Sequence, residues 1–320
     1  MNPASQRYND GPDRAHPCST SHVRPTAAAS HEAVVSPAFR YHGAKFRLSG
    51  WVQQFFPRHD VYVEPFGGAA GVLLTKPRSY AEVYNDLDGD VVNLFRVLQD
   101  PGTRAALVEL CCLTPYARAE FDQAWQPAED PVERARRIVI RAQMGFGSAG
   151  ATQGVTGFRI DTGRACATAQ HLWAKYPDSL AAVAARFVGV LIENRPALDV
   201  MQQHDSATTL HYVDPPYLHA TRVLGGGGKN SCYRHEMTEA DHADLLASVQ
   251  QLHGFVVVSG YPSEMYDDTL TGWERHTTKA RISANRGTKS RTECVWLNPA
   301  AIAGLRLPQQ RQLMPSGDRP

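Results

Sequence analysis

The chain has 320 residues, 42% of them hydrophobic, which is enough for one large hydrophobic core or two modest ones. Its formal net charge of +1 identifies no class of partner, and no run of about 18 apolar residues is present, so no membrane-spanning helix is expected. The six cysteines have no CxxC pair and no regular spacing, which disfavours a disulfide framework or a zinc site and favours a reducing cytoplasm.

The two ends of the chain are predicted to be tails. Residues 1–37 are rich in Pro, Ser, His and Asn and lack the apolar core of a signal peptide, so we expect a disordered segment there. A C-terminal tail is expected over 301–320, with the same composition from about Leu307.

The first predicted elements alternate between strand and helix. A strand at 61–63 leads into a Gly-rich turn and a helix from about Ala70. A second strand at 81–85 leads into an acidic turn and a helix with apolar residues at helical spacing. This order is typical of the start of an α/β sheet.

The alternation then stops. Residues 103–187 have helical patterns, interrupted by the Gly/Ser/Thr-rich stretch 145–158, which is long enough to be a functional loop. Strands are predicted at 188–194, 209–213, 254–260 and 293–298, with a helix after Thr238 as N-cap. We therefore predict one α/β domain, 38–115 and 188–300, carrying a mainly helical insertion at 116–187.

The turn after the first strand is a candidate cofactor site. Ligands of open α/β sheets bind at the carboxyl ends of strands, where Glu64-Pro65-Phe66-Gly67-Gly68 stands. Asp86 ends the second strand and can accept hydrogen bonds from ribose hydroxyls. A tight turn without ligand, and a helix N-cap at Asp86, are the alternatives. NAD and S-adenosylmethionine both have such a ribose, although the missing GxGxxG disfavours a dinucleotide.

The stretch "DPPY" at 214–217 is a candidate catalytic site. The adenine amino group is a poor nucleophile because its lone pair is delocalised, and Asp214 and the Pro215 carbonyl can accept hydrogen bonds from it. Pro215 and Pro216 put no N–H donor in the turn, and Tyr217 can stack on an extruded base. The electrophile would be a sulfonium methyl, and no metal is needed. The alternative is an ordinary Pro-Pro loop.

Two basic clusters suggest contact with a polyanion. No acidic residue lies between Glu274 and Glu293, where six Lys and Arg stand, and four arginines lie in 134–141. A solvated surface is the alternative. The Gly-rich stretch 222–237 follows DPPY and is predicted to be a flap over the base. The predicted nucleic-acid contacts are Arg137, Arg141, Arg222, Tyr233, Arg281, Arg286, Lys289 and Arg291.

From Phe39 to Pro299 the sequence resembles the Dam-like, alpha-class DNA adenine methyltransferases of phages and prophages. The resemblance is carried by "YHGAKFRLSGW", "VEPFGGAAGV", "VYNDLD", "QHD", "DPPY" and "ISANRGTKSRTECVWLN", in this order. It implies a Rossmann-like methyltransferase sheet, S-adenosylmethionine as cofactor, a target recognition domain at 116–187, and a bacterial or phage-encoded cytoplasmic enzyme, in some cases paired with a restriction endonuclease.

The resemblance also implies roles for single residues. Tyr41, Lys45, Phe66, Gly68 and Asp86 would lie at the cofactor. Asp205 matches an acid before the DPPY strand and is also expected at the cofactor. Asp214 would lie near both the cofactor and the target adenine. The sequence departs from the family's F-x-G-x-G turn at Ala70, which stands at the second glycine.

The leading hypothesis is methylation of the adenine amino group in double-stranded DNA. Adenine in RNA is a second substrate with the same chemistry, while a protein glutamine is disfavoured because Asn usually precedes the prolines there. A nicotinamide oxidoreductase would leave DPPY and the basic stretch without a role. An inactive DNA-binding protein would not need Lys45, Asp86, Asp214 and Tyr217 together.

Overall fold

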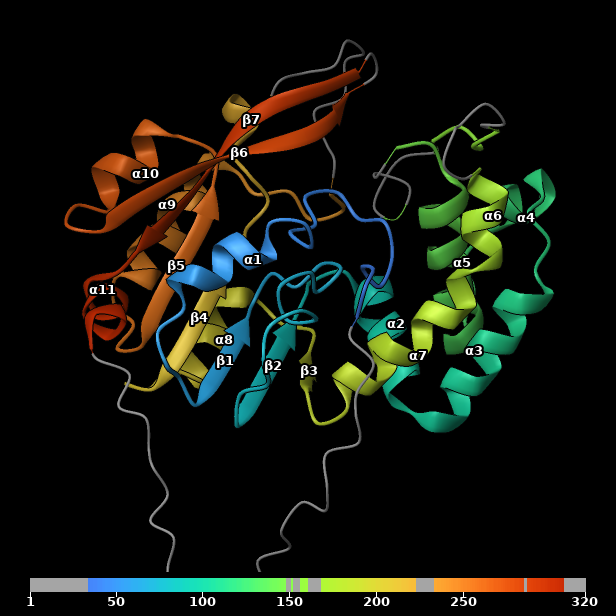
Figure 1. Ribbon diagram of the computed structural model, residues 1–320, viewed down its shortest axis with the longest axis horizontal. Coiled ribbons are helices and arrows are strands. Elements are labelled where there is room, and N and C mark those ends of the chain that lie inside the picture. Colours follow the sequence, from blue (N-terminus) through green and yellow to red (C-terminus); the bar gives the residue numbers. More distant parts are fainter. Residues whose placement is uncertain are drawn as a thin grey trace, which may run out of the picture. The chain divides into compact units, whose positions relative to one another are not determined.

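The computed structural model describes residues 34–147, 151, 156–160, 168–222, 233–284 and 287–307, with the backbone alone at 281–284 and 287–289. Within these ranges one seven-stranded sheet has the order β3-β2-β1-β4-β5-β7-β6 (Figure 1). The strands are β1 (Val61–Glu64), β2 (Ala81–Asn85), β3 (Leu191–Glu193), β4 (Thr209–Val213), β5 (Phe255–Gly260), β6 (Glu274–Ala284) and β7 (Gly287–Leu297). The first five are parallel, and β7 is antiparallel to both β5 and β6. The predicted α/β sheet is confirmed.

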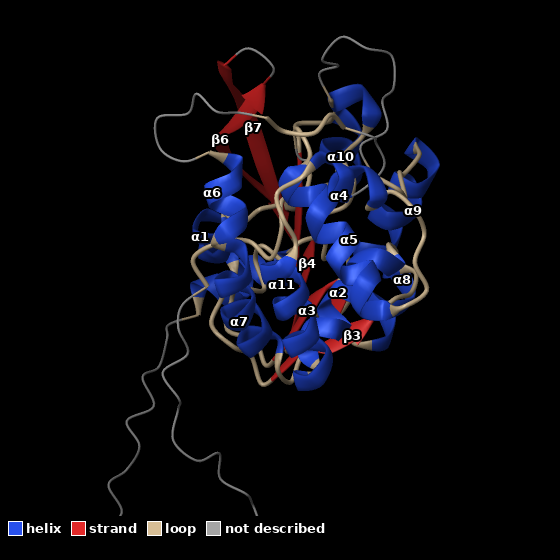
Figure 2. Cartoon of the chain, turned by 90° about the vertical axis from the view of Figure 1, so that its right-hand side faces the viewer, coloured by secondary structure: helices blue, strands red, loops and turns tan. Residues whose placement is uncertain are grey.

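Helices cover both faces of the sheet (Figure 2). Successive side chains of a strand point to opposite faces. Val213 and Val258 pack in one core with α8 (Ala197–Gln203), α9 (Glu239–Val249) and α10 (Glu264–Thr269). Tyr212 and Val257 pack in the other core, to which α1 (Ser49–Val52) and α11 (Pro299–Arg306) contribute. The short 3-10 helices are η1 (Gln53–Phe55) and η3 (His219–Thr221).

A group of helices follows β2 and returns the chain to β3 (Figure 1). It comprises α2 (Gly89–Gln99), α3 (Pro101–Leu113), α4 (Arg118–Gln123), α5 (Pro131–Met144), α6 (Ala169–Ala174) and α7 (Tyr176–Phe187). Helices α5 and α7 pack on α2 and α3 in the same core as the sheet, with Phe95 stacked on Phe187 at 4.3 Å between ring centroids. The limits proposed for the insertion, 116 and 187, fall just before α4 and at the end of α7.

The helix predicted from about Ala70 is absent from the described structure. Residues 71–75 form turns instead, and Ala70 has a φ of +55°, so a right-handed helix cannot include it. This is the position at which the family's turn has its second glycine, so the alanine keeps a left-handed backbone that favours glycine.

Two other predicted segments have different bounds in the structure. The strand expected at 188–194 is limited to Leu191–Glu193, since Gly189 has a φ of +81° and turns the chain just before it. The stretch expected to be tail from residue 301 begins inside α11, which Asn298 caps and whose Ala301 is fully buried. Residues 1–33 of the predicted N-terminal tail lie outside the described residues. So does the predicted C-terminal tail from residue 308.

The hairpin of β6 and β7 extends past the edge of the sheet. Strand β5 pairs with β7 only from Gly260 opposite Cys294 to Val257 opposite Leu297. Because the two strands are antiparallel, the part of β7 before Cys294 lies beyond the carboxyl end of β5. The hairpin therefore projects from the edge at which the DPPY turn leaves β4 (Figure 1).

Candidate functional site

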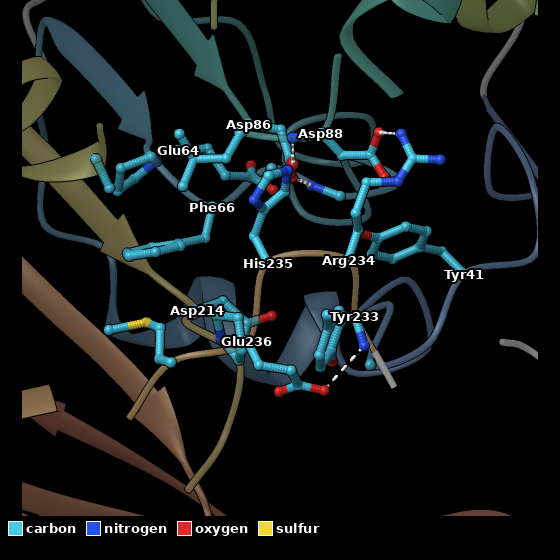
Figure 3. Close-up of a pocket in the computed structure, with 18 of the residues that line it drawn as sticks. Tyr41, Glu64, Phe66, Asp86, Asp88, Asp214, Tyr233, Arg234, His235 and Glu236 are labelled. Atoms are coloured by element: carbon cyan, nitrogen blue, oxygen red, sulfur yellow. Dashed lines mark hydrogen bonds and ion pairs between the residues drawn. The ribbon is translucent and has the colours of Figure 1, made fainter. Parts of the chain in front are cut away.

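A cavity of about 520 Å³ opens at the carboxyl ends of β1, β2 and β4 (Figure 3). Open α/β sheets bind their ligands at this edge. The residues predicted from sequence that line it are Tyr41, Lys45, Glu64, Pro65, Phe66, Gly67, Gly68, Asp86, Asp214, Pro216 and Tyr233. The glycine turn and the DPPY turn, far apart in the sequence, thus form one site.

The glycines of the turn after β1 are required by close packing. A Cβ at Gly67 would lie 2.1 Å from the ring of Tyr84, and one at Gly68 would lie 2.8 Å from the ring of Tyr41. Gly68 also has a φ of +48°, in the left-handed region. The Tyr84 hydroxyl donates to the Gly68 carbonyl at 2.6 Å. The turn is therefore packed between the rings of Tyr84 and Tyr41, and Gly67 and Gly68 line the cavity.

Asp86 is fixed by backbone donors on both of its carboxylate oxygens. The amides of Gly68 and Asp88 each donate to it at 2.8 Å. Burial raises the pKa of Asp86 to about 6, although these hydrogen bonds oppose the shift. The ring of His235 points toward Asp86 (Figure 3). Each oxygen of an ionised carboxylate can accept a further hydrogen bond, so Asp86 can still serve a ligand in the cavity.

Asp214 is held by a lysine and a serine at the end of β4. Lys45 Nζ lies 3.0 Å from Asp214 Oδ1, and the Ser259 hydroxyl donates to the same oxygen at 2.6 Å. The Tyr212 hydroxyl lies 3.2 Å from Ser259 Oγ and can in turn donate to it. Because both contacts use Oδ1, Oδ2 is the oxygen that they leave for a ligand.

Lys45 is only 6% exposed and lies between two carboxylates. Burial disfavours its charged form, but Asp214 and Glu293 outweigh that penalty and raise the pKa of Lys45. Its ammonium group lies 4.7 Å from the centroid of the Tyr217 ring. Lys45 therefore links the cavity to the aromatic group beyond Asp214.

Tyr217 lies beside the cavity rather than in its lining. Its hydroxyl donates to Glu293 Oε2 at 2.9 Å, and its ring meets Tyr261 edge-on, with centroids 4.6 Å apart. The guanidinium of Arg291 covers Tyr261 at 4.7 Å from the centroid. Pro215, which precedes this group, is buried. Tyr217, Tyr261, Glu293 and Arg291 form an aromatic wall, separated from the cavity by Asp214 and Lys45.

Glu64 is a buried acid in the wall of the cavity. It accepts from the Tyr62 hydroxyl at 2.7 Å and from the Leu73 amide at 3.0 Å. Burial, with a smaller contribution from the negative charge of Asp214, raises the pKa of Glu64 to about 8. At neutral pH its carboxyl group is therefore largely protonated and adds little negative charge beside Asp214.

The prediction that Asp205 lies at the cofactor was wrong. Asp205 precedes β4, so it lies at the amino end of that strand, at the opposite edge of the sheet from the cavity. Its carboxylate accepts from His211 Nε2 at 3.1 Å and from the amides of His253 and Gly254 at 2.7 and 3.0 Å. Asp205 instead joins the starts of β4 and β5.

The two arginines of α5 that were predicted to contact DNA have partners within the protein instead. Arg141 is buried, pairs with Asp90 at 3.3 Å and lies over the ring of Trp125. Arg137 pairs with Glu133 at 2.6 Å and donates to two backbone carbonyls. The basic cluster of α5 is a helix face turned toward α2 and α4, which a count of charges does not reveal.

Part of the predicted flap closes one side of the cavity. Residues 223–232 of that prediction lie outside the described residues, whereas 233–237 line the cavity. Arg222 pairs with Glu236 at 2.8 Å, which holds this segment to the end of η3. Tyr233 packs on Tyr41 with centroids 6.1 Å apart and donates to the His42 carbonyl at 3.4 Å.

The segment 233–237 also supplies residues that the sequence did not single out. Arg234 pairs with Asp88 at 2.9 Å and with Asp90 at 3.0 Å, at the start of α2 (Figure 3). The capping box of Thr238 and Asp241 starts α9 directly after Met237. On the side of β3, Pro196, Ala197 and Leu198 line the cavity as well. Only folding brings these residues to the glycine turn, so no local motif could identify them.

The basic stretch forms most of the β6–β7 hairpin. Arg281 pairs with Ser290 across the two strands, and Lys289 stands opposite Ile282. Arg286 lies outside the described residues. Arg291 is partly exposed and donates to the Thr221 carbonyl at 3.2 Å. Lys289 and Arg291 of β7 thus lie in the part of the hairpin beyond β5.

Within the described ranges, no three His, Cys, Asp or Glu side chains are grouped so that they could hold a metal ion. No helix in those ranges is long and apolar enough to cross a membrane.

Comparison with known proteins identifies a family. Residues 41–283 match the family described as D12 class N6 adenine-specific DNA methyltransferase. The chain is 23% identical over 266 residues to the DNA adenine methylases of Escherichia coli strains K12 and O157:H7, covering 79% of this chain and 91% of each relative. Among solved structures, a putative rRNA methylase from Clostridium thermocellum aligns with a TM-score of 0.31 and 9% identity, covering 80% of this chain and 96% of that one. A precorrin 8W decarboxylase from Methanobacterium thermoautotrophicum also has a TM-score of 0.31, with 10% identity over 79% and 89% of the two chains.

Proposed function

Because the chain belongs to the D12 class of N6 adenine-specific DNA methyltransferases, we propose that the cavity binds S-adenosylmethionine and that Asp214 orients a target adenine extruded from double-stranded DNA. The observation that carries the proposal is the Asp214 carboxylate, held on Oδ1 by Lys45 and Ser259 between the cavity and the aromatic wall. DNA adenine methylation itself follows from the family.

The residues present fit S-adenosylmethionine. Phe66, Pro196 and Leu198 provide apolar surface for a purine ring, and Asp86 provides an acceptor for ribose hydroxyls. Besides Glu64, which is largely protonated, the acidic side chains of the lining are Asp86, Asp88, Asp214, Glu236, Asp241 and Asp244, and they outnumber the two cations Lys45 and Arg234. Such a lining suits a ligand that carries positive charge and repels a pyrophosphate, which disfavours the nicotinamide dinucleotide alternative.

When bound, S-adenosylmethionine supplies an electrophilic methyl group on a positively charged sulfur. The protein's part is to present the adenine amino group as a nucleophile. Asp214 and the Pro215 carbonyl accept hydrogen bonds from its two N–H groups. This turns the nitrogen lone pair out of conjugation with the ring. Tyr217 offers its ring for stacking on the extruded base. Lys45 fixes Asp214 and balances its charge in a buried place.

The geometry of the hairpin supports DNA as the polyanion. The end of the β6–β7 hairpin, which has a basic sequence, projects from the sheet edge that carries Asp214 and Tyr217, so phosphate contacts there would place a duplex over the catalytic turn. We restrict the proposed phosphate contacts to Arg281, Arg286 and Lys289, because Arg137, Arg141, Arg222 and Arg291 have partners within the protein.

The proposal is tested by methyl transfer from radiolabelled S-adenosylmethionine to plasmid DNA grown without methylation, to denatured DNA, and to total RNA. We expect label in the duplex, recovered as N6-methyladenine after digestion. Label recovered mainly in RNA would favour the second substrate instead.

Replacing Asp86 with alanine should weaken S-adenosylmethionine binding by about 1.5–3 kcal/mol, the range for losing a hydrogen bond to a charged group. The reason is that Asp86 is the acceptor placed for the ribose, and the Gly68 amide loses its partner as well. Isothermal titration calorimetry measures the affinity, with Asp178→Ala, an exposed acid of α7, as the matched control.

The pH dependence gives a second readout for Asp86. Its pKa is raised to about 6. The carboxylate that accepts from the ribose hydroxyls is therefore present above that pH and is lost as the pH falls through it. The affinity of the parent should fall below about pH 6, and Asp86→Ala should lack that fall. Unchanged affinity in Asp86→Ala, or tighter binding of NAD than of S-adenosylmethionine, would rule the assignment out.

Removing one positive charge from the hairpin should weaken binding to all DNA sequences similarly. Each of Arg281→Ala, Arg286→Ala and Lys289→Ala should reduce the slope of log affinity against log salt concentration by about one. Fluorescence anisotropy over a salt series measures this slope. Arg58→Ala is the control, because Arg58 is exposed just before β1, at the opposite edge of the sheet. An Arg286→Ala enzyme that methylates a different site with an intact slope would contradict the assignment.

A further inference from the structure

The side chain of Glu293 has no role in the site as described so far. It stands in β7 just before Cys294, where the pairing with β5 ends, and it lies outside the residues 41–283 that match the family. Its side chain is 6% exposed. A buried carboxylate loses hydration, and this cost must be offset by partners in the protein.

The direct partner of Glu293 is the phenol of Tyr217. The Tyr217 hydroxyl donates to Glu293 Oε2 at 2.9 Å. Lys45 lies close enough to be a second, electrostatic partner, since Glu293 contributes to the raised pKa of Lys45. Burial raises the pKa of Glu293 itself, and the charge of Lys45 opposes that shift.

The contacts of the Tyr217 ring show what the bond to Glu293 adds. Tyr261 meets the ring edge-on and Lys45 lies over it, so both limit where the ring can be. Neither is a directional bond to the phenol oxygen. The hydrogen bond to Glu293 ties the far end of the side chain to a strand of the sheet, which fixes the direction in which the ring extends.

Resting on the proposed function, in which Tyr217 stacks on the target base, we infer that Glu293 is a positioning residue of the adenine site. It acts through the Tyr217 hydroxyl and holds the ring in the orientation that receives the base. A flexible ring would still bind DNA, but the adenine amino group would reach Asp214 in the correct geometry less often.

The test is a double-mutant cycle on single-turnover methyl transfer to plasmid DNA from a methylation-free host. Glu293→Ala and Tyr217→Phe each break the same bond, so each should slow transfer roughly ten-fold to a hundred-fold, the scale of a loss of positioning. The double variant should be no slower than the slower single variant. Affinity for S-adenosylmethionine should match the parent, because Glu293 does not line the described cavity.

Glu293→Gln separates position from charge. The amide oxygen can still accept from Tyr217, so this variant should retain most of the parental rate. If Glu293→Gln is as slow as Glu293→Ala, or if the losses of Glu293→Ala and Tyr217→Phe multiply in the double variant, the inference is overturned. If Glu293→Ala does not fold, Tyr217→Phe is compared with Tyr217→Phe plus Glu293→Gln. The two rates should be equal, and a further loss would show that the charge is what matters.

Tyr217→Ala in the same assay separates the inference from the function beneath it. If Tyr217→Ala is slow while Glu293→Ala has the parental rate, only the positioning role fails. If Tyr217→Ala itself has the parental rate, the stacking role in the proposed function fails.

Discussion

Asp214→Asn should lower the single-turnover rate of methyl transfer by about 10²-fold or more, the scale seen when one preorganised electrostatic contact is lost. The substitution keeps the size of the side chain but replaces a charged acceptor with an amide. Lys45 and Ser259 both donate to Asp214 Oδ1, so the amide oxygen must take that place. The amide nitrogen then faces the adenine amino group, and a donor opposes a donor.

DNA binding by Asp214→Asn should stay near the parental level, because phosphate contacts supply most of that affinity. Rapid-quench measurement of the transfer rate and anisotropy of bound DNA separate the two effects. Asp178→Asn, an exposed acid of α7, is the matched control and should match the parent. Parental transfer rates in Asp214→Asn would refute its role, and the two prolines would then form an ordinary turn.

Tyr217→Ala should be severely impaired, because it loses about 1–3 kcal/mol of stacking on the base. Tyr217→Phe keeps the ring and should be slowed only by the loss of the bond to Glu293, roughly ten-fold to a hundred-fold. The same single-turnover assay ranks the two variants.

Base extrusion can be followed separately with 2-aminopurine at the adenine that sequencing identifies as the target. Its fluorescence should change more with Tyr217→Ala than with Asp214→Asn. Tyr217 stacks on the extruded base, whereas Asp214 accepts a hydrogen bond from the amino group of that base. Equal signals from the parent and Tyr217→Ala would contradict the stacking role.

The parts of the site that the sequence predicted are those in which a strand and its following turn carry the chemistry. Asp86 and Asp214 each follow a buried strand, and parallel strands place their carboxyl ends at one edge, so both acids were expected there. Lys45 was expected from the family resemblance alone, and the structure pairs it with Asp214.

The parts that the sequence did not predict depend on contacts between distant segments. Arg234 is held at the cavity by ion pairs with Asp88 and Asp90 at the start of α2, far away in the sequence. Glu293 of β7 contacts Tyr217, which follows β4. Arg141 was assigned to DNA because its partner Asp90 is not a neighbour in the sequence. Asp205 follows a family pattern, but its place before β4 puts it at the wrong edge of the sheet.

The central claim is tested most directly in cells. The parent and Asp214→Asn are expressed in a host without DNA methylation, and modified adenines are mapped by long-read sequencing. The account predicts N6-methyladenine at one recurring short sequence for the parent, and a far smaller methylated fraction of those sites for Asp214→Asn produced at the same low level. Genomic DNA without N6-methyladenine in cells that hold the folded parent, or equal methylation by both proteins, would contradict it.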